Sequence, residues 1–128
     1  MRRRIQAGEL AAEAVTADEQ RRLRQALAQP FDGPTVVVTH FAPSLQSADP
    51  RYGLAPGTAG FCNALDELLP LADVWLHGHL HCAIDYRDAS GRCRVVANPL
   101  GYADKGEQAA FKPRWLIEVP RGAPRPAI

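Results

Sequence analysis

Three histidines stand at alternate positions in the segment WLHGHLH, which spans residues 75–81. The fourth histidine of the chain, His40, directly follows the apolar run at 35–39. Neutral imidazole is a good ligand for Zn, Fe, Mn and Ni, and open α/β sheets place their sites just outside the carboxyl ends of strands. The pattern therefore indicates a metal site that includes His40, His79 and His81.

Each candidate ligand follows a predicted strand. The continuous β-branched run at 35–39 is typical of a strand buried on both faces, and Val74–Leu76 forms a second buried strand. A hairpin is predicted from two short runs around the turn at 88–91. The predicted strands after the histidines are Ala83–Arg87, Arg92–Ala97 and Arg114–Val119.

Two helices are predicted around the first strand. Thr16 and Glu19 form a capping box, and an apolar stripe ends before Pro30, which predicts a helix over 16–28. A second helix begins at Thr58, and its apolar face comprises Phe61, Leu65, Leu68 and Leu69. A long Pro- and Gly-rich loop at 42–57 separates them. The element order predicts an α/β fold with an antiparallel continuation.

Composition limits the partners. Lys and Arg number 15 against 14 Asp and Glu, so the chain has no strong field for nucleic acid or a membrane surface, and neither is predicted as a partner. No apolar stretch approaches the ~20 residues of a membrane span. Cys62, Cys82 and Cys93 include no CxxC motif, and the first residues lack the apolar part of a signal peptide. These features favour a single cytoplasmic domain.

At this point the chain resembles a known family. The runs VVVTH at 36–40, WLHGHLH at 75–81, Asp85-Tyr86 and RVVANPLGY at 94–102 are together similar to the carboxyl-terminal half of a calcineurin-like metallophosphoesterase. The resemblance covers residues 16–119. It implies β-sheets flanked by helices in a sandwich, two divalent metal ions (Mn, Fe or Zn) in a complete domain, and hydrolysis of a phosphoester substrate by a phosphatase-type reaction.

The same resemblance assigns the ligands. His40 and His79 would bind one metal and His81 the other, while Gly78 would let the backbone turn tightly between the histidines. His77 is expected to be a hydrogen-bonded core or outer-shell histidine. No catalytic acid or base is assigned. The residues expected to line the site are Gly78, His77, Asn98 and Tyr102, although a turn asparagine and a packed tyrosine remain alternatives for the last two.

The carboxylate motifs of the family's amino-terminal half, Asp-x-His and Gly-Asp-x-x-Asp, do not occur in the 128 residues, nor does Gly-Asn-His. We therefore expect an amino-terminal segment at 1–15, the carboxyl-terminal part of a phosphoesterase domain at 16–119, and a Pro-rich tail at 120–128. A start recorded too far downstream would give the same pattern. Such a chain is expected to be weakly active or inactive and to self-associate through its exposed sheet.

A second interpretation comes from a different class of protein. If residues 77–81 stay extended, the side chains of His77, His79 and His81 share one face, because strand side chains alternate. Three imidazoles on tetrahedral Zn leave one open position. This arrangement predicts a non-catalytic, mononuclear metal-binding or interaction module. The number of bound ions distinguishes the two interpretations.

Overall fold

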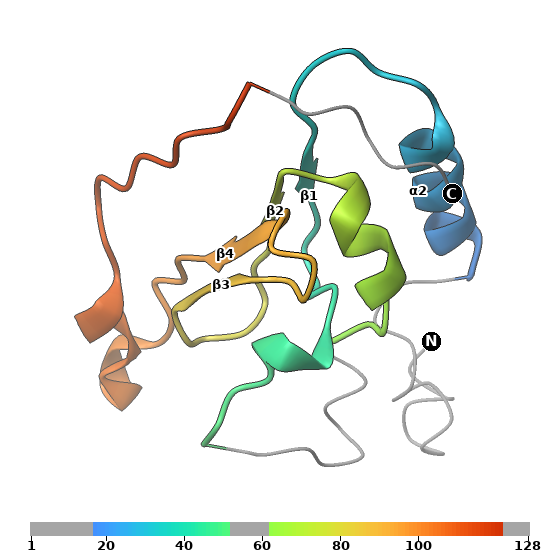
Figure 1. Ribbon diagram of the computed structural model, residues 1–128. Helices are drawn as coiled ribbons and strands as arrows, with labels where there is room; N and C mark the ends of the chain where they lie inside the picture. The colour runs from blue at the N-terminus through green and yellow to red at the C-terminus, as the bar shows by residue number, and fades with distance from the viewer. Residues whose placement is uncertain (1–16, 52–61, 122–128) are drawn as a thin grey trace.

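The computed structural model describes residues 17–51 and 62–121, which form a small α/β domain with one α-helix, a four-stranded mixed sheet and several 3-10 turns (Figure 1). The strands are β1 (Val36–Val38), β2 (Val74–Leu76), β3 (Ile84–Arg87) and β4 (Arg94–Ala97). Their order in the sheet is β1-β2-β4-β3. The first three strands of that order are parallel, and β3 runs antiparallel to β4. The predicted α/β class with an antiparallel continuation is confirmed.

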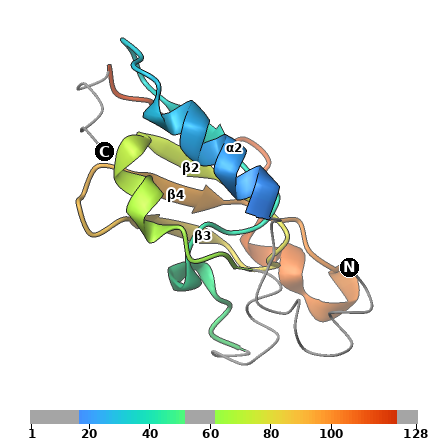
Figure 2. The ribbon, with the colours of Figure 1, turned by 90° about the vertical axis from the view of Figure 1, so that its right-hand side faces the viewer.

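One face of the sheet is covered by two helical elements, α2 (Ala17–Ala28) and the 3-10 helix η4 (Asp66–Leu71) (Figure 2). Val37, Trp75 and Val95 lie opposite one another across three strands and point into this layer. Their burial removes a continuous apolar row from water, which favours the sheet over the open chain. The other buried members of this core are Leu27, Leu65, Leu68, Leu69, Leu71, Ala72 and Cys93.

The second face of β1 is open. Val36 is 44% exposed and Val38 is 71% exposed, so the prediction that this strand is buried on both faces is wrong. This face of the sheet is covered at the interior strand β2, where Val74 is 2% exposed, but not at β1, which lies at the edge and whose outer side pairs with no strand within 17–51 and 62–121. The β-branched run therefore presents apolar side chains to solvent.

The helices agree with the sequence in part. The helix at Ala17–Ala28 is confirmed, while Thr16 lies outside the described residues, as do Thr58 and Phe61. In the described part of the second predicted helix, the prediction of an α-helix is wrong: the chain forms η4, which contains Pro70. Proline lacks a backbone N–H and disfavours a helix interior. The smaller 3-10 helices are η2 (Leu45–Ser47), η5 (Ala103–Lys105) and η6 (Glu107–Ala110).

The carboxyl-terminal prediction also fails. Residues 114–119 form no strand, and Leu116 is 93% exposed. A run of residues that favour β-structure becomes a strand only when another strand edge is available for pairing. The segment at 114–119 pairs with none of the described strands. The predicted strand at 74–76 and the hairpin at 84–97 are confirmed. In the described part of the chain, no helix has the length and apolar character needed to cross a membrane.

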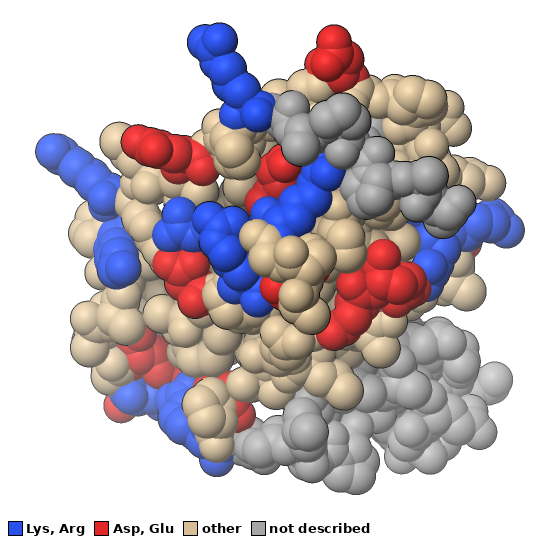
Figure 3. Space-filling view, in the orientation of Figure 1, with Lys and Arg blue, Asp and Glu red and all other residues tan. Residues whose placement is uncertain are grey.

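Charged side chains of both signs are interspersed over the face shown in Figure 3.

On the hairpin, Arg94 forms a two-pronged ion pair with Asp85, with both N–O distances at 2.8 Å. This pairing joins β3 to β4 at the surface, where an ion pair contributes little to stability.

The hairpin turn depends on Asp88, which is buried. Its carboxylate accepts hydrogen bonds from the backbone N–H of Cys93 at 2.8 Å and from the Ser90 hydroxyl at 2.7 Å. Asp88→Ala is expected to lower the free energy of unfolding by about 1–3 kcal/mol, because a buried N–H loses its acceptor. Urea denaturation measures the change. Asp32→Ala, at an exposed position before β1, is the control and should differ little from the parent chain.

Candidate metal centre

Parallel pairing brings His40 and His79 together. The β1–β2 ladder continues past the ends of both strands: the N–H of Thr39 donates to the carbonyl of Leu76 at 3.0 Å, and the N–H of Gly78 donates to the carbonyl of His40 at 3.0 Å. Nε2 of His40 and Nδ1 of His79 lie 3.2 Å apart. The two residues predicted to share a metal are thus neighbours at the carboxyl ends of adjacent strands.

The 3.2 Å separation is that of a hydrogen bond between the two rings, and it also fits two nitrogens that share an ion. Two nitrogens on tetrahedral Zn, each about 2.05 Å from the metal, lie about 3.3 Å apart. Burial, and after it the neighbouring His40 and His81 rings, lower the pKa of His79. His79 therefore stays neutral to a lower pH than a free imidazole, and a neutral imidazole is the form that binds metal.

The backbone turn lies at His79. Its φ is 63°, in the left-handed region that non-glycine residues adopt uncommonly and that is enriched at functional sites. Gly78 has no positive φ, and a Cβ there would meet its nearest atoms, on His40, at an ordinary 3.7 Å. The expectation that glycine is needed at 78 for a tight turn is therefore wrong. His79 itself takes the unusual conformation.

His77 is a core histidine, as predicted. It is buried, and its ring nitrogens lie 3.1 Å from the hydroxyl of Ser47 and 3.1 Å from the carbonyl of Gly78. Burial lowers its pKa, and the contact with the Gly78 carbonyl opposes that effect. Because His79 has a φ of 63° and residues 79–82 form a bend, the stretch 77–81 is not extended throughout, and the single-face arrangement of three histidines expected for the second interpretation is not found.

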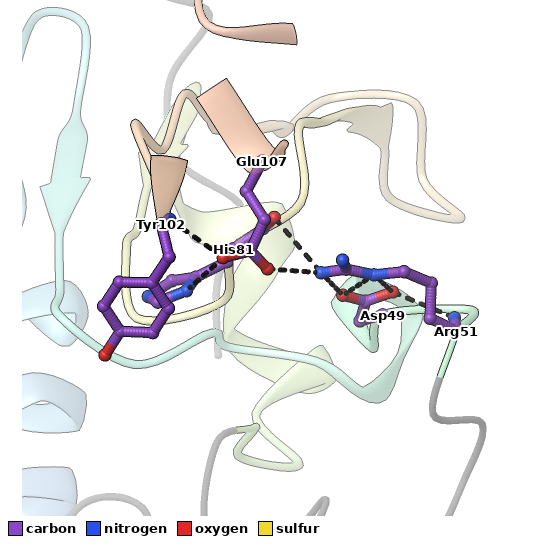
Figure 4. A network of polar contacts seen from close by, with 5 residues as sticks. All are labelled: Asp49, Arg51, His81, Tyr102 and Glu107. Carbon is purple, nitrogen blue, oxygen red and sulfur yellow. Dashed lines mark hydrogen bonds and ion pairs between the residues drawn. The ribbon is translucent and has the colours of Figure 1, made fainter. Parts of the chain in front are cut away.

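His81 stands apart from the pair and has partners of its own. Its Nδ1 lies 3.1 Å from a carboxylate oxygen of Glu107, and its ring packs edge-on against Tyr102 at a centroid distance of 4.5 Å (Figure 4). Sequence reasoning placed Tyr102 near the site but missed Glu107. No helix or strand spacing relates positions 81 and 107, so the contact has no sequence pattern that would indicate it.

Asn98 directly follows β4, but its side chain is hydrogen-bonded to the backbone of Lys112. Its amide donates to the carbonyl of Lys112 at 2.8 Å and accepts from the N–H of Lys112 at 3.0 Å. This double contact pins the segment that follows η6 to the end of the sheet. Both polar ends of the amide are thereby engaged with backbone.

The chain matches no family model, no curated protein and no solved structure. The function must therefore be argued from the geometry of the site.

The side chains that could donate to a metal supply part of the ligand set of one ion and do not supply the ligands of two. Among the residues that the structure describes, no group of three or more His, Cys, Asp or Glu side chains is gathered as a metal site. His40 and His79 supply two nitrogen donors without negative charge. Three acids in the described part of the chain are engaged elsewhere: Asp49 with Arg51, Asp73 with the N–H of Thr35, and Asp85 with Arg94.

Proposed function

We propose that this chain contributes the histidine ligands of a calcineurin-like metallophosphoesterase, an enzyme that hydrolyses a phosphoester with the help of divalent metal ions. The observation that carries the proposal is the 3.2 Å separation of His40 Nε2 and His79 Nδ1. These nitrogens meet where two parallel strands end, the place where α/β sheets hold their sites.

In this proposal His40 and His79 hold one divalent ion, and His81 contributes to a second. A bound ion of this kind polarises a phosphoryl oxygen and lowers the pKa of bound water. The chain's own residues orient the donors: the ladder through Gly78 fixes His40 against His79, and Phe41 packs beside His79 with ring centroids 4.7 Å apart.

The charge of two metal ions indicates which ligands the site lacks. Two dications about 4 Å apart repel by roughly 17 kcal/mol at an effective dielectric of about 20. Neutral imidazoles do not offset this repulsion, and among the described residues no carboxylate joins His40 and His79 in a metal-binding group. We infer that hydrolysis requires carboxylate ligands supplied by further polypeptide. The open edge of β1 supports this inference, because a sandwich of the proposed family needs additional strands.

The test is metal content together with turnover. The chain is dialysed against Zn²⁺ or Mn²⁺, analysed for bound metal, and assayed with 4-nitrophenyl phosphate and bis(4-nitrophenyl) phosphate. We expect at most one weakly bound ion and no metal-dependent rate above that of the His79→Ala variant. Addition of a polypeptide that carries Asp-x-His and Gly-Asp-x-x-Asp motifs is expected to raise both metal content and rate. Tight binding of two ions by the chain alone would contradict the proposal.

A binding module without catalysis is the second candidate. It is favoured by the finding that, over residues 17–51 and 62–121, no group of three or more His, Cys, Asp or Glu side chains is gathered as a metal site. A module of this kind would hold one ion through His40 and His79, and added carboxylate-bearing polypeptide would change neither metal content nor turnover.

A further inference from the structure

Glu107 connects three segments that are distant in the sequence. Its side chain is 3% exposed, and one carboxylate oxygen lies 3.1 Å from His81 Nδ1 and 2.9 Å from the backbone nitrogen of Tyr102 (Figure 4). The other oxygen accepts from Arg51 at 2.8 Å. The carboxylate is thus fixed from two sides, and one of its contacts is a candidate metal ligand.

The backbone is shaped to receive this side chain. Gly101 has a φ of 70°, and a Cβ placed there would come within 2.4 Å of the Cβ of Glu107. A side chain at 101 would therefore need the Glu107 segment to shift, since the obstructing atom is not the end of a flexible chain. The absence of a side chain at 101 also lets the N–H of Tyr102 reach the carboxylate.

Arg51 holds the other side of the network. Its guanidinium is bound by both oxygens of Asp49, with Nε 3.2 Å from one and 3.0 Å from the other. Hydrogen bonding by Arg51, and next by the N–H of Tyr102, lowers the pKa of Glu107 to about 2. Near neutral pH the Glu107 carboxylate is therefore ionised and can only accept hydrogen bonds.

We propose that Glu107 is the positioning residue of His81, which it holds in the tautomer that carries the proton on Nδ1 and leaves Nε2 as a free lone pair. An ionised carboxylate requires a donor, so Nδ1 must bear the hydrogen, and in a neutral imidazole the other nitrogen is then the acceptor. Ligand histidines usually have such a carboxylate partner. That His81 binds metal rests on the proposed function; the tautomer does not.

The experiment reads the tautomer directly. Two-bond ¹⁵N–¹H spectra of the full chain are recorded at about pH 8, above the ordinary titration range of imidazole. We expect the wild-type His81 signal, assigned by its loss in His81→Ala, to show Nδ1–H. Glu107→Ala is expected to shift it toward Nε2–H. Asp104→Ala, which removes an exposed acid from the neighbouring η5, should leave it unchanged.

Zn²⁺ titration of the same proteins tests the metal role. Loss of an outer-shell partner typically weakens metal binding by roughly 10–100-fold, and we expect a loss of this size at the His81 resonances in Glu107→Ala once the added carboxylate-bearing polypeptide has supplied the remaining ligands of the second ion. A wild-type His81 protonated on Nε2, or the same tautomer in Glu107→Ala, would overturn the inference, and the first result does not depend on the folding of Glu107→Ala. If Zn²⁺ does not bind at His40 and His79, the proposed function is wrong. The tautomer of His81 would still show whether Glu107 positions its ring.

Discussion

Replacement of His79 is expected to abolish metal binding by this chain. Of the two candidate ligands that face each other at 3.2 Å, His79 is the one with the left-handed backbone, so the choice of variant matters. Alanine removes the imidazole but keeps the Cβ and with it the strain of about 1–2 kcal/mol at such a φ, whereas glycine removes both the ligand and the strain. His79→Gly should therefore bind no metal and still fold.

His77→Ala is the matched control two residues away. The ring nitrogens of His77 contact Ser47 and Gly78 in the parent chain, so the variant should keep most of its metal content although its free energy of unfolding falls. Equilibrium dialysis with Zn²⁺ and elemental analysis measure the first effect, and thermal unfolding checks that each variant is folded. If His77→Ala loses more metal than His79→Gly, the three-histidine module is the better account of the site.

Replacement of Val38 by lysine is expected to abolish self-association of the chain. We propose that a second copy pairs with the open edge of β1, where Val36 and Val38 present apolar surface. Edge strands with exposed apolar side chains and unpaired backbone groups add strands from other chains, and lysine is a residue that natural proteins use to prevent this. The three residues of β1 provide few hydrogen bonds, so the association is expected to be weak and visible on concentration.

Size-exclusion chromatography over a concentration series measures the effect. The parent chain should elute earlier as its concentration rises, and Val38→Lys should elute at a constant monomer volume. Leu116→Lys is the matched control: it adds the same charge at a more exposed apolar residue that belongs to no strand. Equal loss of association in both variants would show that net charge, and not the edge of β1, is responsible.

The sequence predicted the elements that have a local pattern. The capped stripe before Pro30 gave the α-helix, and the turn at Asp88 gave the hairpin, because both depend on residues that are close in the chain. The predictions failed where the outcome depends on distant partners. A run such as Val36–Val38 has the same composition at the centre of a sheet and at its edge, and the residues at 114–119 lacked a partner strand altogether among the described elements.

The candidate site follows the same division. The pairing of His40 with His79 was expected from the family resemblance, and the structure brings the two together because β1 and β2 are parallel neighbours. The role of His77 followed from its place at the end of a buried strand. Glu107 could not be found, since its approach to His81 depends on the path of an irregular segment and on the room left by Gly101. Metal binding itself stays a prediction.

The sheet order has a consequence for the order of assembly. β3 and β4 are joined by a short turn and can pair early, whereas β1 must close a long loop to reach β2, and such pairings form late. His40 is attached to this late strand at the rim of the sheet. A brief detachment of β1 would separate His40 from His79 while the rest of the sheet persists, since edges open at lower free energy than cores. We therefore expect the two imidazoles to come together late in folding and to separate early in unfolding.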